Sequence, residues 1–404
     1  MNKLTKNTIL LKNTTIFDGN SPLLLRNTDI LIENKQIEAL GSNIPANKDT
    51  KIIDASKFTV IPGLIDCHTH FRSWMPPLFF QFGVTTIRDL GSDPDWIISL
   101  REKEKNGDNS LPRIICYGPL LDGVPAYWGT KWKGSVEIDS LKTARKITTS
   151  LIKKGVGGFK TYMGLPKELM KEIVKIAHEH NLPVASDLWS VSAWDAAKMG
   201  ISSIEHARGI LFPILEDEIQ LFIDLFIKKH VFIDPTFTVE TIGAYIQTVG
   251  NENYPNLNLV PAGQKKEWLN WKTESWYKNV KKSFYKERQE KEIYKAKFIA
   301  AFHKAGGKVV AGSDTPNPFV IPGFSLHQEI QKMVEIGLTP IEAIRTATGT
   351  AAQLLRRTDV GTIKVGHLAD LVLIDGNPTE NILELSKINT VIKNGEIVYR
   401  NSVC

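Results

Sequence analysis

Two histidines separated by one residue are the first side chains in this chain whose type and spacing could bind a metal. His68 and His70 end the stretch Ile61-Pro-Gly-Leu-Ile-Asp-Cys-His-Thr-His70, which begins as an apolar run and is therefore predicted to be a buried strand. Side chains alternate between the faces of a strand, so both imidazoles project to the same side. Two imidazoles supply half of a tetrahedral zinc site. A chance pair of polar residues would look the same, so the motif needs support from later strands.

Four further polar side chains lie in or at the end of later apolar runs. Lys160 lies inside Gly158-Phe-Lys-Thr-Tyr-Met163, where a buried charge needs a partner. The other three close their runs, and they are Asp187, His206 and Asp314. Together with the two histidines they could form one polar site, provided that the strands end side by side.

The elements that position these residues alternate between strand and helix. Helical patterns are predicted at Asp95–Lys105, Leu141–Lys154, Lys167–His180 and Glu216–Lys229. With the opening strand there are eight predicted strands, the others at Thr85–Leu90, Arg113–Tyr117, Gly158–Met163, Pro183–Leu188, Ser202–His206, Val231–Thr236 and Lys308–Ser313. This repetition predicts an α/β fold, a (β/α)8 TIM barrel, whose chemistry lies at the C-terminal ends of the strands.

The two ends of the chain read differently from its centre. Both are rich in short strands and turns, and Asn394-Gly395 is typical of a hairpin turn. We therefore predict a small β-sandwich domain built from residues 1–60 and 360–404, and a barrel over residues 61–359. Residues 239–300 are too long for one βα unit and carry several aromatic residues, including Trp268, Trp271 and Trp276. They predict a helical insertion that either buries its own aromatic face or forms a lid.

Composition excludes several classes of function. The chain has 404 residues, 42% hydrophobic and 23% charged, with a net charge of +6 and three cysteines. These values favour an ordinary globular protein without a disulfide scaffold. No basic stretch interleaves with stacking aromatics, and no run approaches a membrane span, so neither nucleic acid nor membrane is an expected partner. We expect a cytoplasmic protein with a small-molecule substrate, and homo-oligomerisation is open; a signal peptide already removed would leave no trace.

The motifs together resemble the amidohydrolase superfamily of metal-dependent hydrolases, especially its imidazolonepropionase-related and Xaa-Pro dipeptidase-like branch. The resemblance covers essentially the whole chain. Its motifs are Pro62-Gly-Leu-Ile-Asp-Cys-His-Thr-His70, Gly312-Ser-Asp-Thr315, Thr339-Pro-Ile-Glu-Ala-Ile-Arg-Thr-Ala-Thr348 and Gly361-Thr-Ile-Lys-Val-Gly-His-Leu-Ala-Asp-Leu-Val372.

The resemblance implies a role for each strand-end residue. His68 and His70 match the pair that binds a first metal, and His206 matches a ligand of a second metal. Lys160 matches a lysine that is carboxylated and bridges two metals, as an anionic carbamate can and an ammonium cannot. Asp314 matches the aspartate that binds the first metal and shuttles the proton. The implied cofactor is one or two divalent cations, most typically zinc, with manganese, iron or cobalt as alternatives.

One position departs from the pattern. Where the superfamily normally has a second-metal histidine, this chain has Asp187. His178 and His180 lie nearby in sequence, but on the preceding helix and hence at the opposite end of the barrel. Three interpretations stay open: Asp187 is a carboxylate ligand, the site holds a single metal, or activity has been lost.

The expected reaction is therefore hydrolysis of an amide, peptide-like or cyclic amide C–N bond by metal-activated water. Asp314 would act as the proton shuttle, and His206 could stabilise the oxyanion where it is not a ligand. A lactone, carbamate or phosphoester hydrolase, or an impaired ligand-binding homologue, are the alternatives. Tyr127, Tyr162 and Arg208 follow strand ends and are the predicted substrate contacts.

Overall fold

A computed structural model describes residues 7–210, 216–242, 253–274 and 282–401 of the chain. Parallel strands form its centre. One sheet has the order β6-β7-β8 and the other the order β10-β9-β11-β12-β13-β14-β15. The strands are β6 (Leu64–Thr69), β7 (Val84–Asp89), β8 (Arg113–Cys116), β9 (Leu120–Asp122), β10 (Ser135–Glu137), β11 (Phe159–Thr161), β12 (Val184–Ser186), β13 (Ser203–Glu205), β14 (Phe232–Asp234) and β15 (Lys308–Val309). Every central strand predicted from the sequence is present in this set, so the predicted α/β alternation is confirmed.

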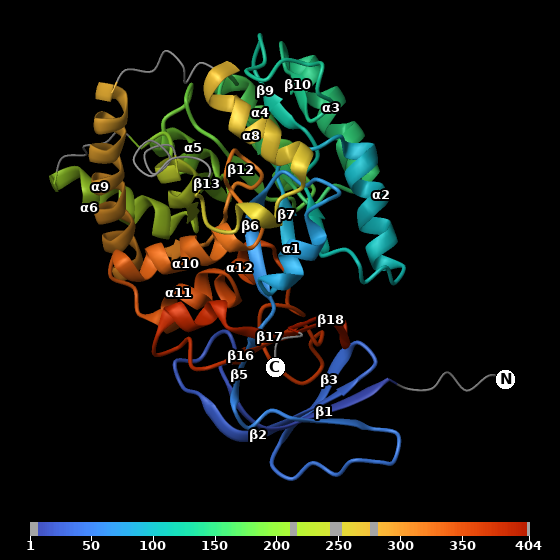
Figure 1. Ribbon diagram of the computed structural model, residues 1–404. Coiled ribbons are helices and arrows are strands. Elements are labelled where there is room, and N and C mark those ends of the chain that lie inside the picture. Colours follow the sequence, from blue (N-terminus) through green and yellow to red (C-terminus); the bar gives the residue numbers. More distant parts are fainter. Residues whose placement is uncertain (1–6, 211–215, 243–252, 275–281, 402–404) are drawn as a thin grey trace.

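Helices alternate with these strands and surround them (Figure 1). Sequence signals explain their ends: the Ser140 hydroxyl caps the start of α3 and left-handed Gly155 ends it. Thr339 and Glu342 form a reciprocal capping box at the start of α11. The helices are α1 (Pro76–Gln81), α2 (Pro94–Lys105), α3 (Leu141–Lys154), α4 (Lys167–Glu179), α5 (Ala193–Met199), α6 (Glu216–Lys228), α8 (Ala262–Glu274), α9 (Lys282–Lys304), α10 (Phe324–Glu335), α11 (Pro340–Thr346) and α12 (Gly349–Leu354), with short 3-10 turns η1 (Leu257–Leu259) and η3 (Ile382–Ser386).

Strands from both ends of the chain join in one further sheet, below the helices in Figure 1. Its order is β18-β17-β16-β5-β1-β2-β3, and β4 pairs with β1. The strands are β1 (Thr8–Ile16), β2 (Leu25–Glu33), β3 (Gln36–Gly41), β4 (Lys51–Asp54), β5 (Phe58–Pro62), β16 (Leu371–Asp375), β17 (Ile388–Lys393) and β18 (Glu396–Arg400). The predicted joining of the two ends is thus present as a single mixed sheet; its closure into a sandwich stays a prediction.

A buried polar network ties this terminal sheet to the parallel strands. Arg113, at the start of β8, forms an ion pair with Asp370 and donates to the Asn394 side chain at 2.5 Å. Lys393, at the end of β17, donates to Glu104 of α2 at 2.6 Å. We call these five residues the base network, because they lie at the N-terminal ends of the parallel strands. Each of their charged groups has an oppositely charged partner.

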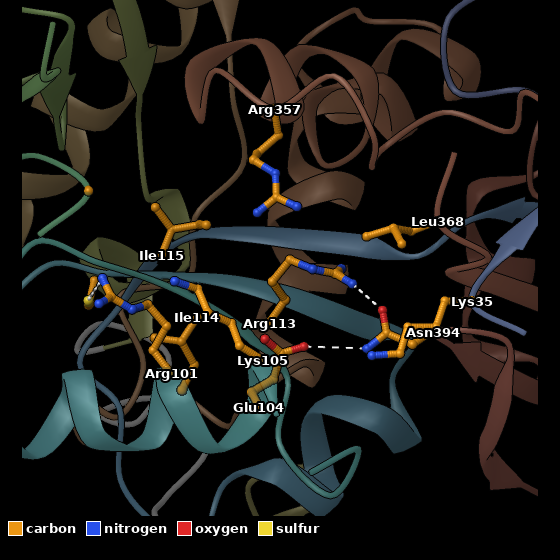
Figure 2. A pocket seen from close by; sticks show the side chains of 12 residues that line it. Lys35, Arg101, Glu104, Lys105, Arg113, Ile114, Ile115, Arg357, Leu368 and Asn394 are labelled. Atoms are coloured by element: carbon orange, nitrogen blue, oxygen red, sulfur yellow. Dashed lines mark hydrogen bonds between the residues drawn. The ribbon is translucent and has the colours of Figure 1, made fainter. Parts of the chain in front are cut away.

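A cavity of about 360 Å³ borders the base network (Figure 2). Its lining combines five cationic residues with one carboxylate, Glu104, which Lys393 already neutralises. No residue in this lining is a histidine or an unpaired acid, so the cavity offers no divalent cation a ligand set. The lining residues are Lys35, Arg101, Glu104, Lys105, Arg113, Ile114, Ile115, Cys116, Gly157, Arg357, Leu368 and Asn394.

The predicted insertion between β14 and β15 is helical in its described part, with α8 and α9. Trp268 of α8 is buried, and its ring lies 6.3 Å from Trp74 and 5.8 Å from Phe319. Both partners lie outside the insertion, but the same apolar cluster contains Tyr254 and Leu257, so this tryptophan packs both on the segments after β6 and β15 and on the insertion itself. Trp276 falls outside the described residues. None of the helices described is long and apolar enough to cross a membrane.

Candidate functional site

The alternation predicted for the first parallel strand is present in β6. Cys67 is fully buried in an apolar cluster with Ile65, Phe232 and Val310, on the side away from the histidines. His68 faces the opposite side and is 1% exposed. Cys67 is therefore a core residue, as predicted, and burial raises the pKa of its thiol well above the usual value.

Three imidazoles converge on one carboxylate at the C-terminal ends of the strands. The Nε2 atoms of His70 and His68 lie 3.2 Å and 3.5 Å from Oδ1 of Asp314. Nε2 of His206 lies 4.0 Å from Oδ2 of the same carboxylate. The rings of His68 and His206 are 4.8 Å apart, centroid to centroid. The structure thus brings together four residues that are 246 positions apart in the sequence at their extremes, between His68 and Asp314.

The other ring nitrogen of each histidine faces a partner on the outer side. Nδ1 of His70 lies 3.4 Å from the carbonyl oxygen of Gly91, and Nδ1 of His206 lies 2.6 Å from the Thr236 hydroxyl. Nδ1 of His68 lies 3.0 Å from Oε2 of Glu205, although the ring N–H is not aligned for a hydrogen bond. A hydrogen on Nδ1 leaves the lone pair on Nε2, which is the arrangement of a metal-binding histidine.

Backbone strain accompanies these side chains. His206 and Asp314 have φ values of 61° and 62°, and Thr236, which contacts His206, has a φ of 43°. Left-handed conformations are unfavourable for residues with a side chain, most of all for a β-branched one. At Gly312 a Cβ would overlap both His68 and Asp234, so only glycine fits beside the first histidine. Strain of this kind is concentrated at functional sites.

The electrostatic surroundings keep His68 and His206 neutral and the Asp314 carboxylate charged. Burial, aided by Lys160, lowers the pKa of His68 to about 4. Burial and nearby Arg208 lower the pKa of His206 well below its usual value. Burial alone would raise the pKa of Asp314, but His68 and His70 outweigh it and hold this pKa below the usual value. At neutral pH the site therefore holds neutral His68 and His206 beside an ionised Asp314 carboxylate.

These residues fit a divalent cation. Zinc–nitrogen bonds of about 2.0–2.1 Å place neighbouring ligand atoms of a tetrahedral site about 3.3 Å apart. The separations of 3.2 Å and 3.5 Å between the histidine nitrogens and Asp314 Oδ1 match this spacing. Lone pairs that face an ionised carboxylate repel it unless a positive charge lies between them. His68, His206 and Asp314 also form a group of donor atoms that lie within 4.8 Å of one another.

Lys160 lies in β11 as predicted, but without the partner that a buried charge needs. Its side chain is fully buried, and its Nζ has no hydrogen-bond partner among the residues described. Burial lowers the pKa of this amine, while Glu205 and Asp187 oppose the shift. A neutral amine is the form that can react with carbon dioxide, so the position is compatible with the carbamate implied by the resemblance.

Asp187 directly follows β12, and its carboxylate is hydrogen-bonded to an arginine. Its Oδ2 accepts a hydrogen bond from Nη1 of Arg208 at 2.8 Å and lies 3.5 Å from Nε2 of His206. Nη2 of Arg208 donates to Oε1 of Glu240 at 3.1 Å. The predicted substrate contact Arg208 is therefore engaged on both sides by carboxylates of the chain itself. We call His68, His70, Lys160, Asp187, His206 and Asp314 the strand-end cluster.

The predicted substrate contacts Tyr127 and Tyr162 belong to an aromatic group beside the cluster. The indole N–H of Trp128 donates to the Tyr162 hydroxyl at 2.9 Å. The Tyr127 ring packs edge-on against Trp128 at 5.1 Å and lies 6.4 Å from the Tyr162 ring. Tyr127 and Trp128 are 58% and 57% exposed, so a ligand that approached the cluster could contact them. Contact with substrate stays a prediction for all three residues.

A second buried polar layer was not predicted from the sequence. Arg88 of β7 donates to both carboxylate oxygens of Glu205 at 3.0 Å and 2.9 Å. Although burial opposes it, Arg88 lowers the pKa of Glu205. Burial and the neighbouring Glu205 raise the pKa of Asp234, whose oxygens lack hydrogen-bond partners among the described residues. A charged residue inside an apolar strand is the signal that singled out Lys160, and it would have found these residues too.

His178, His327 and His367 lie outside the cluster, as predicted for His178 from its place on the preceding helix. His178 is exposed near the C-terminal end of α4, where Nε2 lies 2.9 Å from the Gly200 carbonyl oxygen. His327 of α10 is buried, and its Nε2 donates to the carbonyl oxygen of Phe82 at 2.8 Å. His367 lies 2.9 Å from the Thr362 hydroxyl in the return to the terminal sheet.

Known proteins resemble this chain over most of its length. A 5-methylthioadenosine/S-adenosylhomocysteine deaminase from Carboxydothermus hydrogenoformans is 24% identical over 440 residues, covering 97% of this chain and 92% of that protein. An imidazolonepropionase from Alkaliphilus metalliredigens is 23% identical over 414 residues, covering 91% and 89% respectively. A solved Xaa-Pro dipeptidase with bound methionine has the same fold, with a TM-score of 0.75 at 22% identity over 98% of this chain and 100% of that one.

An imidazolonepropionase and an Xaa-Pro dipeptidase, which represent the branch that the motifs indicated, are thus among the similar proteins, and a family match confirms the prediction of an amidohydrolase enzyme. The match to the family itself extends over residues 79–398 and is described as the amidohydrolase family. It spans the strand ends that carry Lys160, Asp187, His206 and Asp314. The chain therefore belongs to the amidohydrolase family.

Proposed function

We propose that this protein is a metal-dependent hydrolase that cleaves an amide, peptide-like or cyclic amide C–N bond. The observation that carries the proposal is the convergence of three histidine Nε2 atoms on Asp314, at 3.2 Å, 3.5 Å and 4.0 Å. Each Nδ1 atom of these histidines faces a partner of its own, so the Nε2 lone pairs are available to a cation. We propose His68, His70, His206 and Asp314 as the residues that hold it.

We also propose that the two parallel sheets close into a (β/α)8 barrel whose mouth is the strand-end cluster. Support comes from the backbone hydrogen bonds between β6 and residues 311–315. Cys67 donates to Ala311, Asp314 to His68 and His70 to Thr315, at 3.1 Å, 2.8 Å and 2.7 Å. On the other side Gly157, just before β11, donates to Cys116 of β8 at 2.8 Å. Residues 1–60 and 360–404 would form the separate β domain.

The proposed reaction assigns the proton transfers to Asp314. A divalent cation at the site would polarise the scissile carbonyl and lower the pKa of a water molecule. Asp314 is ionised at neutral pH because its pKa is lowered, so it can accept the proton that the attacking water loses. It can then return this proton to the leaving nitrogen. His206 either helps to hold the cation or, with its hydrogen on Nε2, stabilises the oxyanion; the Thr236 hydroxyl can pair with Nδ1 in both tautomers.

The relatives and the aromatic group support a C–N bond as the target. The relatives are named as a deaminase, an imidazolonepropionase and an Xaa-Pro dipeptidase, and dipeptide cleavage breaks an amide bond. Tyr127, Trp128 and Tyr162 offer an apolar surface to one side of a bound substrate. We propose that an apolar or aromatic part of the substrate packs there.

The proposal is tested by assaying the protein as purified, after removal of metal by a chelator, and after restoration of zinc or manganese. The panel should contain Xaa-Pro dipeptides, N-acyl amino acids and lactams, with a lactone, a carbamate and a phosphotriester as competing substrate classes. We expect turnover of a C–N substrate that disappears with the metal and returns with it. Asp314→Asn should lower kcat/KM by about 10²–10⁴-fold because it removes the proton acceptor.

Asp375→Asn is the matched control, because it makes the same chemical change at an exposed residue of β16. Its kcat/KM should equal that of the unmodified protein. Preference for the lactone, carbamate or phosphotriester would replace the proposed bond type. Turnover that survives complete removal of metal, or that Asp314→Asn leaves unchanged, would refute the mechanism. Binding without turnover across the panel would favour a ligand-binding protein.

A further inference from the structure

Asp187 stands where the family resemblance leads one to expect a histidine of a second metal site. It directly follows β12, is 1% exposed, and lies beside His206 in the strand-end cluster. A carboxylate could in principle replace the imidazole as a ligand. Whether it does depends on what already occupies its oxygen atoms.

Arg208 occupies the oxygen that faces the site. Its Nη1 lies 2.8 Å from Asp187 Oδ2, the same oxygen that is 3.5 Å from His206 Nε2. A cation bound jointly by His206 and Oδ2 of Asp187 would therefore share this oxygen with the guanidinium. Two positive groups cannot approach the same carboxylate oxygen from the same side without strong repulsion.

The position of Arg208 is fixed from several directions. Nη2 donates to Glu240 at 3.1 Å, and the guanidinium lies 5.4 Å from the centroid of the Trp189 ring. Its side chain is only 28% exposed. Burial lowers the pKa of Arg208, but Asp187 and the other neighbouring groups together raise it above its usual value, so the guanidinium remains charged. An arginine held in this way is a permanent cation with a defined position.

We infer that the Arg208–Asp187 ion pair takes the place of the second metal, so that this protein binds one divalent cation per chain. The inference rests on the proposed function, because it assumes that the convergent histidines and Asp314 hold the first cation. The guanidinium supplies the positive charge at the second position. Lys160 has then no second cation to bridge, so it remains an amine and is not carboxylated.

The experiment measures bound metal by plasma mass spectrometry after equilibrium dialysis against a buffered excess of free zinc. The wild-type chain should hold one zinc. Arg208→Met removes the competing charge and should hold two, because Asp187 and His206 become available together. Glu240→Gln is the matched control, because it removes the negative charge of the other carboxylate that binds Arg208 and leaves the pair with Asp187 in place. This variant should hold one zinc. Asp187→Ala should also hold one, since Asp187 is not a ligand of the first cation.

A second readout follows Lys160 directly. Carbon-13 NMR in labelled bicarbonate detects a lysine carbamate without any assay of activity. The signal should be absent from the wild-type chain and present in zinc-loaded Arg208→Met. Its presence in the wild-type chain would overturn the inference.

The outcomes separate this inference from the proposed function. Two zinc ions in the wild-type chain would overturn the inference and leave a metal-dependent hydrolase in place. One zinc in folded Arg208→Met would also overturn it, because the ion pair would not be what excludes a second cation. If Arg208→Met fails to fold, Asp187→Ala still decides: loss of a zinc relative to the wild-type chain would make Asp187 a ligand and refute the inference. No zinc in any of the proteins would refute the proposed function itself.

Discussion

The side chains of Lys160 and Lys393 are both fully buried, but the two amines have opposite surroundings. Lys393 belongs to the base network, where it donates to Glu104 at 2.6 Å and to Asn109 at 3.3 Å. Lys160 belongs to the strand-end cluster, where its Nζ has no hydrogen-bond partner among the described residues. Burial lowers the pKa of both amines, yet only in Lys393 does a bonded carboxylate oppose that shift directly.

The difference extends to the surroundings of each lysine. In the base network Arg113 pairs with Asp370. The Asn394 side-chain oxygen accepts a hydrogen bond from Arg113, and the Asn394 backbone N–H donates one to Asp370. In the strand-end cluster Oδ1 of Asp187 and Oδ1 of Asp314 lack hydrogen-bond partners among the described residues. Buried polar groups are normally satisfied, and an unsatisfied group costs about 1–3 kcal/mol. The base network is thus built to hold the terminal sheet in place, whereas the strand-end cluster is built to receive something else.

The largest expected effect on the free energy of unfolding comes from a substitution in the base network, where the buried polar groups are paired. Lys393→Met leaves the buried carboxylate of Glu104 without its cation, and removing one partner of a buried ion pair costs about 3–5 kcal/mol. We expect the urea midpoint of unfolding to fall accordingly, while turnover per folded molecule is unchanged. Lys387→Met is the control, because Lys387 pairs with Glu384 at 3.1 Å on the surface. That change should shift the unfolding free energy by less than about 1 kcal/mol.

A loss of turnover in folded Lys393→Met, without loss of stability, would contradict the division between the two regions. Such a result would mean that the cavity beside the base network takes part in the reaction and does not only belong to the structural base of the protein (Figure 2).

A second comparison uses two buried histidines with similarly low pKa values. Burial lowers the pKa of both His68 and His327 to about 4, but only His68 faces the strand-end cluster. A histidine whose pKa is lowered on folding contributes stability above about pH 6.5, and this contribution is lost as the pH falls towards about 4. For one histidine the loss corresponds to about 3 kcal/mol. His327→Gln keeps a donor for the Phe82 carbonyl oxygen and should remove that part of the acid destabilisation.

The measurement is the free energy of unfolding between pH 7 and pH 4 in metal-free protein, for the wild-type chain and His327→Gln. His178→Gln, on an exposed part of α4, controls for the loss of an imidazole. The free energy of unfolding should depend less steeply on pH in His327→Gln, and its pH dependence should be unchanged in His178→Gln. Adding zinc should oppose protonation of His68 and leave the effect of His327→Gln unchanged. Parallel pH curves for the wild-type chain and His327→Gln would show that this histidine does not contribute as its burial suggests.

The sequence predicted which residues lie in the strand-end cluster better than it predicted the hydrogen bonds that these residues make with their neighbours. His68, Lys160 and Asp314 were identifiable because strand alternation and buried charge are local properties of the chain. The pairing of Asp187 with Arg208 depends on how two turns after β12 and β13 approach each other, and no local pattern encodes that distance. The base network joins Glu104 to Lys393, 289 positions apart, and its members look like ordinary surface charges in the sequence. The contacts of Trp268 with Trp74 and Phe319 were not predicted either, because these partners are remote in the sequence.

The smallest effect on the free energy of unfolding should come from a lysine-to-methionine substitution in the strand-end cluster. Lys160→Met replaces an unpaired buried amine with an apolar side chain of similar length, so it leaves no bonded partner behind. Removing an unsatisfied polar group is neutral or stabilising, by up to about 1–2 kcal/mol. In metal-free protein we therefore expect the urea midpoint to stay constant or rise, opposite in sign to Lys393→Met. A fall as large as that of Lys393→Met would mean that Lys160 is held by the acids around it, Glu205 and Asp187 first among them, and that the strand-end cluster is satisfied after all.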